Sequence, residues 1–141
     1  MLMKKRYLVA THGKLADGFQ SSLNILADKG KSIEVINAYV TDEDYTPKIT
    51  EFVQGIQQDE QAIIFTDLFG GSVNQKVVAE VLTQKKENIF IISNTNLAVL
   101  LTLIVGSEEE KINAELIQEA IEESQVKLVP TSQTVEKDTF F

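Results

Sequence analysis

Short apolar runs that alternate with longer amphipathic segments are the feature that most constrains the fold of this chain. Each run is rich in β-branched or aromatic residues and has the length of a fully buried strand. The runs are 7–10, 33–36, 62–65 and 89–92. Between them, apolar residues recur at helical spacing in sets that begin at Leu15, Ile49 and Val73. This alternation predicts an α/β fold, with a doubly wound, mostly parallel four-stranded sheet and helices on both faces.

The C-terminal third of the chain gives three further expectations. The segment "NTNLAVLLTLIV" predicts a short helix buried on more than one side, and "SEEEKINAELIQEAIEES" predicts a capped helix with the acidic run 108–110 in its first turn. "VKLV", residues 126–129, is a candidate fifth, antiparallel strand. "PTSQTVEKDTFF" has the character of a tail. We therefore expect one domain over residues 1–129 and a C-terminal tail over 130–141.

Composition and charge narrow the classes of function. The formal net charge of -8 gives no electrostatic reason to bind nucleic acid or an anionic membrane. No stretch approaches the ~20 apolar residues of a membrane span, so direct membrane insertion is not expected. The chain has no Cys, which fits a cytoplasmic location. With one His and no Cys, only carboxylates remain as metal ligands, and we expect neither a metal nor an organic cofactor.

The order of the strands decides which loops meet. In the strand order 2-1-3-4, the winding reverses between the first and third strands, and ligands bind at the carboxyl ends of those strands. The loop after the first strand is Thr11-His12-Gly13, and the loop after the third begins with Asp67. The only histidine of the chain and an aspartate far away in sequence are thus expected to be neighbours.

A histidine beside an aspartate can act as a nucleophile. A carboxylate that accepts one imidazole N–H fixes the tautomer and leaves the other nitrogen free as a nucleophile. The residues Gly70-Gly71-Ser72 directly precede the third helix, where backbone N–H groups and the helix dipole favour an anion. The pattern suits phosphoryl transfer, with His12 and Asp67 as catalytic residues. The expected phosphate-binding residues are Thr11, Gly70, Gly71 and Ser72.

Three segments carry a family resemblance. "ATHGKLADGFQSSLNIL", "FTDLFGGSVNQ" and "ISNTNLAVLL" resemble the IIA domain of the mannose-type (mannose, fructose, sorbose) sugar phosphotransferase system, over nearly the whole chain. The resemblance implies that His12 takes a phosphoryl group from the phosphocarrier protein HPr and passes it to a IIB component that supports sugar import. It also implies that Asp67 of the D-x-x-G-G segment orients His12, and that Ser72 lies at the phosphate.

The same resemblance implies a homodimer in which the C-terminal strand, here "VKLV", pairs with the other subunit. The chain departs from the family pattern at two places where proline is frequent: Val73, and the segment Asn96-Leu97-Ala98-Val99. These departures bear on loop rigidity and partner choice more than on the chemistry. The dihydroxyacetone-kinase phosphotransfer subunit shares the opening motif, but the D-x-x-G-G segment favours the sugar system.

The residues of this predicted site also suit purely structural roles. Asp67 is typical of a turn, and Ser72 is typical of the N-cap of the third helix. A non-catalytic module that binds a nucleotide or another anion in the same crevice is the alternative from a different class, although the chain lacks a G-x-G-x-x-G fingerprint after the first strand. An aspartate-phosphorylated receiver domain is excluded, because it needs an acidic pair where this chain has Thr-His-Gly.

Overall fold

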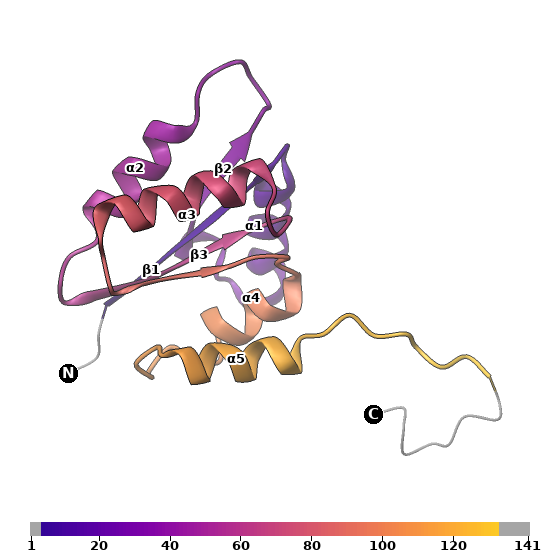
Figure 1. Ribbon diagram of the computed structural model, residues 1–141. Helices are drawn as coiled ribbons and strands as arrows, with labels where there is room; N and C mark the ends of the chain where they lie inside the picture. Colours follow the sequence, from indigo (N-terminus) through magenta and orange to yellow (C-terminus); the bar gives the residue numbers. More distant parts are fainter. Residues whose placement is uncertain (1–3, 133–141) are drawn as a thin grey trace.

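The computed structural model describes residues 4–132 and has the predicted α/β architecture (Figure 1). Four strands form one sheet, all paired in parallel, in the order β2-β1-β3-β4. The strands are β1 (Lys4–His12), β2 (Ile33–Ala38), β3 (Glu60–Thr66) and β4 (Ile89–Ile92). The predicted strand order is confirmed. β1 is longer than predicted and extends to His12, so that the histidine ends a strand and does not sit in a loop.

Helices cover both faces of the sheet, as predicted. α2 and α3 lie on one face, whereas α1, α4 and α5 lie on the other (Figure 1). The helices are α1 (Leu15–Ala27), α2 (Thr46–Gly55), α3 (Ser72–Gln84), α4 (Leu97–Ile104) and α5 (Ala114–Glu123), with a short 3-10 helix at Gly30–Ser32. Among residues 4–132, no helix has the length and apolar character needed to cross a membrane.

The strand pleat divides the core into two layers. On β1, Tyr7 and Val9 pack against the α1, α4 and α5 layer, while Leu8 and Ala10 pack against the α2 and α3 layer. This alternation follows from the period of two of a strand, and the unbroken apolar run of β3 follows from burial on both faces. The two layers hold the carboxyl ends of β1 and β3 at a fixed spacing.

The start of α5 differs from the expectation. The acidic run 108–110 lies in a turn before the helix, and α5 begins at Ala114. The side-chain oxygen of Asn113 accepts the N–H of Leu116 at 2.8 Å, so Asn113 is the N-cap. A side-chain cap that bonds the backbone fixes a helix start, whereas acidic residues only favour its first turn. Glu108 instead pairs with Lys29 at 2.6 Å.

Residues 126–129, the candidate fifth strand, form no strand with the described part of the chain. They follow α5 in a segment that extends away from the body of the protein (Figure 1). Val126 is 92% exposed and Leu128 is 96% exposed, because no strand of the described residues pairs with them. Of the predicted tail, residues 133–141 lie outside the described residues, and the boundary at 129/130 stays a prediction.

Asn74 of α3 connects the helix to the loop that follows β3. Its side-chain oxygen accepts the N–H of Gly70 at 3.1 Å, and its amide group donates to the Thr66 hydroxyl at 2.9 Å. The Thr66 hydroxyl in turn donates to the carbonyl of Ile92 at 3.1 Å. Asn74 is buried, so water cannot replace these bonds. This chain of hydrogen bonds fixes the 67–71 loop relative to β3 and β4.

We predict that Asn74→Ala lowers the free energy of unfolding by about 1–3 kcal/mol, because it leaves the Gly70 N–H and the Thr66 hydroxyl without their partner. Gln75→Ala is the matched control. Gln75 also bonds Gly70, through the Gly70 carbonyl at 2.6 Å, but it is exposed and water replaces it. Urea unfolding of both variants checks the prediction, and equal free energies for the two would contradict it.

Candidate functional site

The structure brings His12 and Asp67 together at the carboxyl edge of the sheet. Pairing between β1 and β3 ends at Ala10 and Thr66, so Asp67 leaves β3 beside the last residues of β1. His12 Nδ1 lies 2.8 Å from Asp67 Oδ2, and the backbone N–H of His12 donates to the same oxygen at 2.7 Å. The predicted meeting of the two segments is therefore present, and the carboxylate contacts both the ring and the backbone of the histidine.

This contact decides which ring nitrogen is free. A carboxylate only accepts hydrogen bonds, so Nδ1 of His12 carries the proton that it donates to Asp67. The lone pair of the neutral ring is then on Nε2. The Asp67 side chain is 10% exposed, whereas the His12 side chain is 42% exposed. The carboxylate is buried behind the ring, and the ring faces solvent.

The pKa of Asp67 reflects this environment. Burial alone raises the pKa of the carboxyl, but the hydrogen bonds from the backbone and the ring of His12, and the charge of the ring in its protonated form, outweigh burial and hold it below its usual value. Because the folded pKa lies below the unfolded value of about 3.9, the interaction stabilises the fold at neutral pH. Its contribution is lost as the pH falls through the folded pKa.

Ser72 contacts the opposite nitrogen of the ring. It is the first residue of α3, after the N-cap Gly71, and its Oγ lies 3.3 Å from His12 Nε2. Ser72 is therefore not the helix cap, and its hydroxyl is directed to the site. A Cβ on Gly71 would lie 3.1 Å from the Leu68 carbonyl oxygen and 3.7 Å from His12 Cε1. The ring has room for a Cβ, but the contact with the Leu68 carbonyl is tight, so a larger residue at position 71 would displace the 67–71 loop.

The remaining predicted phosphate ligands have partners elsewhere. Thr11 is fully buried, and its hydroxyl accepts the N–H of Ala16 at the start of α1 at 2.8 Å. The N–H of Gly70 donates to Asn74, and the N–H of Gly71 donates to the Leu68 carbonyl at 2.9 Å. What remains for an anion is the Ser72 hydroxyl and the first-turn N–H groups of α3, whose N-cap supplies no side-chain acceptor.

Sequence reasoning missed Tyr39, which contacts the site from the end of β2. Its ring stacks on the His12 ring, with centroids 5.2 Å apart and planes at 29°. Its hydroxyl lies 2.8 Å from Ser72 Oγ and 3.1 Å from the hydroxyl of Tyr45. The signal that finds it is the parallel register: His12 pairs with Ala38, so the residue after Ala38 must lie at the same edge of the sheet.

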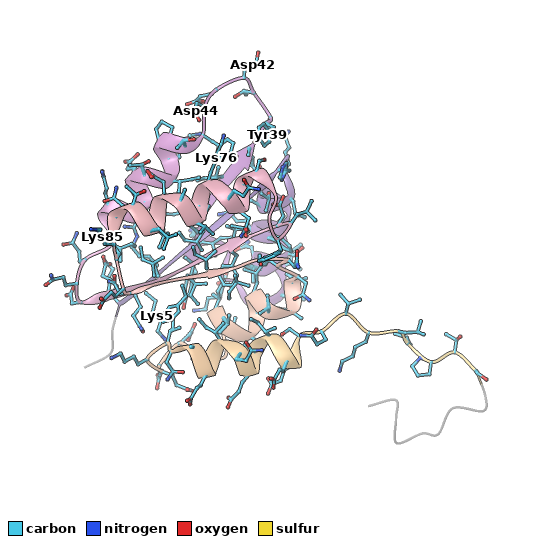
Figure 2. The ribbon with its side chains drawn as sticks, viewed as in Figure 1. Lys5, Tyr39, Asp42, Asp44, Lys76 and Lys85 are labelled. Carbon is cyan, nitrogen blue, oxygen red and sulfur yellow. The ribbon has the colours of Figure 1, made fainter. Side chains whose placement is uncertain are left out.

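The backbone of Tyr39 adopts a φ of 68°, in the left-handed region. For a bulky residue this conformation costs of order 1–3 kcal/mol and concentrates at functional sites. The Ser72 and Tyr45 hydroxyls, with a smaller effect of the Lys76 charge, lower the pKa of Tyr39. Burial, followed by the hydrogen bond with Tyr39, raises the pKa of Tyr45. Figure 2 shows Lys76 on α3 beside the loop that carries Tyr39 and Asp44.

Asn94, after β4, supports the loop that carries Asp67. Its N–H donates to the Asp67 carbonyl at 2.5 Å, and its side-chain oxygen accepts the N–H of Phe69 at 2.8 Å. Held in this way, Leu68 and Phe69 are 66% and 76% exposed beside the histidine. Asn96, by contrast, caps α4 by accepting the N–H of Val99 at 2.9 Å.

A comparison with protein families decides the assignment of the chain. The model of the EIIA-man family, described as the PTS system fructose IIA component, matches residues 6–125. The chain belongs to this family. The matched segment contains His12, Asp67 and Ser72, so the site lies inside it. The chain is thus a member of the IIA components of sugar phosphotransferase systems.

Solved structures agree with this assignment. One is a Klebsiella pneumoniae protein assigned to the phosphoenolpyruvate-dependent sugar phosphotransferase system permeases, with 32% identity, a TM-score of 0.72 and 84% of each chain covered. The IIA protein associated with the fucose utilization operon of Streptococcus pneumoniae has 23% identity, a TM-score of 0.72, and 89% of this chain and 94% of that chain covered. The latter likeness shows the fold alone. No curated protein sequence matches the chain significantly.

The contact with Asp67 makes a prediction about the ring of His12. In the native protein we expect the neutral ring to carry its proton on Nδ1 alone. Asp67→Ala removes the acceptor, and we expect the signals to shift toward the tautomer protonated on Nε2. Nitrogen-15 NMR measures this directly, since the chain has a single histidine. Asp17→Ala, which removes an exposed carboxylate from α1, is the control. An Nε2–H tautomer in the native protein would contradict the geometry.

Proposed function

We propose that this IIA component is a phosphocarrier that accepts a phosphoryl group on Nε2 of His12 from phosphorylated HPr and passes it to a IIB component. The observation that carries the proposal is the hydrogen bond between His12 Nδ1 and Asp67 Oδ2 at 2.8 Å, with Nε2 on the exposed side of the ring. A nucleophile needs a free lone pair and access to its partner, and Nε2 of His12 has both.

Phosphoryl transfer to His12 requires no proton to leave the ring. The Nε2 lone pair forms the bond to phosphorus, and the bond between phosphorus and the donor atom breaks, with its electron pair returning to the donor. The ring then gains positive charge, which the adjacent Asp67 carboxylate stabilises without reacting itself. Transfer to IIB reverses these steps, because His12 is the leaving group in the second reaction.

The start of α3 supports the proposal as a cradle for the phosphoryl oxygens. The Ser72 hydroxyl and the uncapped first-turn N–H groups are donors placed beside Nε2. They add the positive end of the helix dipole to the attraction. Since phosphoryl transfer is catalysed mainly by positioning and electrostatic stabilisation, this set of donors suffices without a metal or an organic cofactor.

The surroundings of His12 suit a protein partner. Exposed apolar side chains lie at the start of α1 and on the loops after β2 and β3: Leu15, Tyr39 and Val40, and Leu68 and Phe69. The carboxylates of Asp42, Glu43 and Asp44 border this apolar rim and favour a partner surface with positive charge. An apolar contact inside a charged border is the usual construction of a specific, transient interface.

The exposed segment 126–129 supports the homodimer that the sequence resemblance implies. Its alternating apolar residues have no neighbouring strand among residues 4–132, and β4 is an edge strand with unpaired backbone groups. If this segment paired as an antiparallel strand with the sheet of a second subunit, the apolar side chains of 126–129 and the unpaired backbone groups of the edge strand would both be buried. The carrier role places the protein in the cytoplasm, where it would exchange phosphoryl groups with HPr and IIB.

We predict that His12→Ala abolishes labelling by phosphoenolpyruvate, enzyme I and HPr, because the acceptor atom is removed. Asp67→Ala lowers the transfer rate about 100-fold or more, because the ring loses its orientation and its counter-charge. Intact mass before and after acid treatment measures both effects, since a phosphohistidine is acid-labile. Asp59→Asn, an exposed carboxylate at the opposite edge of the sheet, is the control and keeps the native rate.

Labelling that survives in His12→Ala would remove His12 from the mechanism. A native rate in Asp67→Ala would reduce Asp67 to a turn residue. A small ligand that saturates the crevice while no phosphorylated species forms would instead identify a non-catalytic anion-binding module.

The apolar rim gives a separate prediction. Phe69→Ser raises the KM for phosphorylated HPr about 5- to 20-fold and leaves kcat unchanged, because an exposed aromatic side chain contributes binding energy and does not touch the reacting atoms. Leu82→Ser is the matched control, since Leu82 is 70% exposed on α3 but far from the loop. An equal KM for the two variants would show that the rim does not contact HPr.

A further inference from the structure

We propose that Tyr39 is a positioning residue for phosphoryl transfer, whose hydroxyl holds the Ser72 hydroxyl at the reacting nitrogen of His12. The inference rests on the proposed function of His12 as the phosphoryl acceptor. It adds a residue from the end of β2 to a site that the family motifs build from β1 and β3 only.

The hydrogen bonds around Ser72 run in a defined direction when Nε2 of His12 takes its donor from the protein. His12 Nδ1 donates to Asp67, so Nε2 must accept, and the single proton of the Ser72 hydroxyl points to Nε2 at 3.3 Å. The Ser72 oxygen then accepts from the Tyr39 hydroxyl at 2.8 Å. The Tyr39 oxygen accepts from the Tyr45 hydroxyl at 3.1 Å. In this direction, the Tyr39 hydroxyl holds the rotamer in which Ser72 donates to the ring.

The conformation of Tyr39 supports a role beyond packing. A φ of 68° is easy for glycine or asparagine and costly for tyrosine, yet the residue is 54% exposed and fills no core. Strain of this kind persists where the side chain is needed in one place. Here that place is against the imidazole, with the two rings stacked at 5.2 Å.

The positive charge of Lys76 favours the Tyr39 hydroxyl as a hydrogen-bond donor. The Lys76 ammonium lies 5.9 Å from the centre of the Tyr39 ring and 4.3 Å from that of Tyr45, and it projects from α3 one turn after Ser72. A positive charge beside a phenol makes its O–H more acidic and a stronger donor. The groups that face Tyr39 thus polarise its hydrogen bond toward Ser72.

During transfer, the Nε2 lone pair forms the bond to phosphorus and the donor atom keeps the electrons of the bond that breaks. The Ser72 hydroxyl loses Nε2 as its acceptor and donates to a phosphoryl oxygen instead. Tyr39 continues to donate to Ser72. The Ser72 oxygen therefore keeps its place while its proton changes acceptor from Nε2 to the phosphoryl oxygen. A donor that is already oriented costs little reorganisation at the moment of reaction.

A double-mutant cycle tests the proposal on the full chain. Tyr39→Phe, Ser72→Ala and the double variant are compared for transfer from phosphorylated HPr. We expect Tyr39→Phe to lower kcat about 5- to 10-fold with KM unchanged, because the ring stays and only the hydroxyl is lost. We expect no further loss when Tyr39→Phe is added to Ser72→Ala, since Tyr39 acts through Ser72. Leu82→Ala, an exposed apolar residue of α3 away from the site, is the control and keeps the native kcat.

A second measurement separates positioning from stability. Tyr39→Asn adopts the same backbone conformation at lower cost, so we expect its melting temperature to stay at or above the native one while kcat falls at least as far as in Tyr39→Phe. Nitrogen-15 NMR of the unphosphorylated protein gives a readout that needs no donor. We expect the Nε2 resonance of His12 in Tyr39→Phe to move toward the position it has in Ser72→Ala.

A native kcat in Tyr39→Phe, or equal losses in the native and Ser72→Ala backgrounds, would overturn the proposal. An unchanged Nε2 resonance in Tyr39→Phe would overturn it as well. These outcomes differ from a failure of the proposed function, which would appear as labelling that persists in His12→Ala or is absent from the native protein.

Discussion

The carboxylate of Asp67 bonds His12 twice, once at the backbone N–H and once at ring Nδ1, and the site depends on this contact. The backbone bond fixes the end of β1 relative to the loop after β3. The ring bond fixes the tautomer and leaves Nε2 on the exposed side. Because the carboxylate is mostly buried and the ring is half-exposed, Asp67 supplies orientation and charge while the His12 ring stays open to solvent. The other groups of the site, Ser72 and Tyr39, contact the His12 ring and not the buried carboxylate.

The supporting structure keeps the two residues in register. β1 is the central partner of both β2 and β3, so its last residue contacts loops from either side. Asn74 and Asn94 fasten the 67–71 loop to β3 and β4, and Gly71 lets the start of α3 pack closely against the Leu68 carbonyl of the same loop. The result is a rigid carboxyl edge at which a histidine, a carboxylate and a helix start meet. This is the position in which open α/β sheets bind ligands, and for a IIA component the ligand we propose is a phosphoryl group.

Sequence patterns predicted the features that depend on periodicity and parallel topology. Short apolar runs predicted four parallel strands, and the meeting of His12 with Asp67 followed once the order 2-1-3-4 was assumed for them. Features that depend on side-chain hydrogen bonds were not predictable in the same way. The α5 start was placed at the acidic run, but the cap on Asn113 decided it. The Thr11 hydroxyl, which was expected at the phosphate, accepts the N–H of Ala16 at the start of α1, a contact that periodicity does not reveal. Tyr39 was missed because only the loops after the first and third strands were considered, although the register of β2 places it beside His12.

We propose that Asp67 holds Nδ1 of His12 and so presents Nε2 for phosphorylation. The most direct test is to identify which ring nitrogen carries the phosphoryl group, by combined phosphorus-31 and nitrogen-15 NMR on the protein labelled with phosphoenolpyruvate, enzyme I and HPr. We expect a single phosphohistidine at His12 with phosphorus bonded to Nε2, while Nδ1 keeps its proton. Phosphorus bonded to Nδ1, or to any atom other than His12 Nε2, would contradict it.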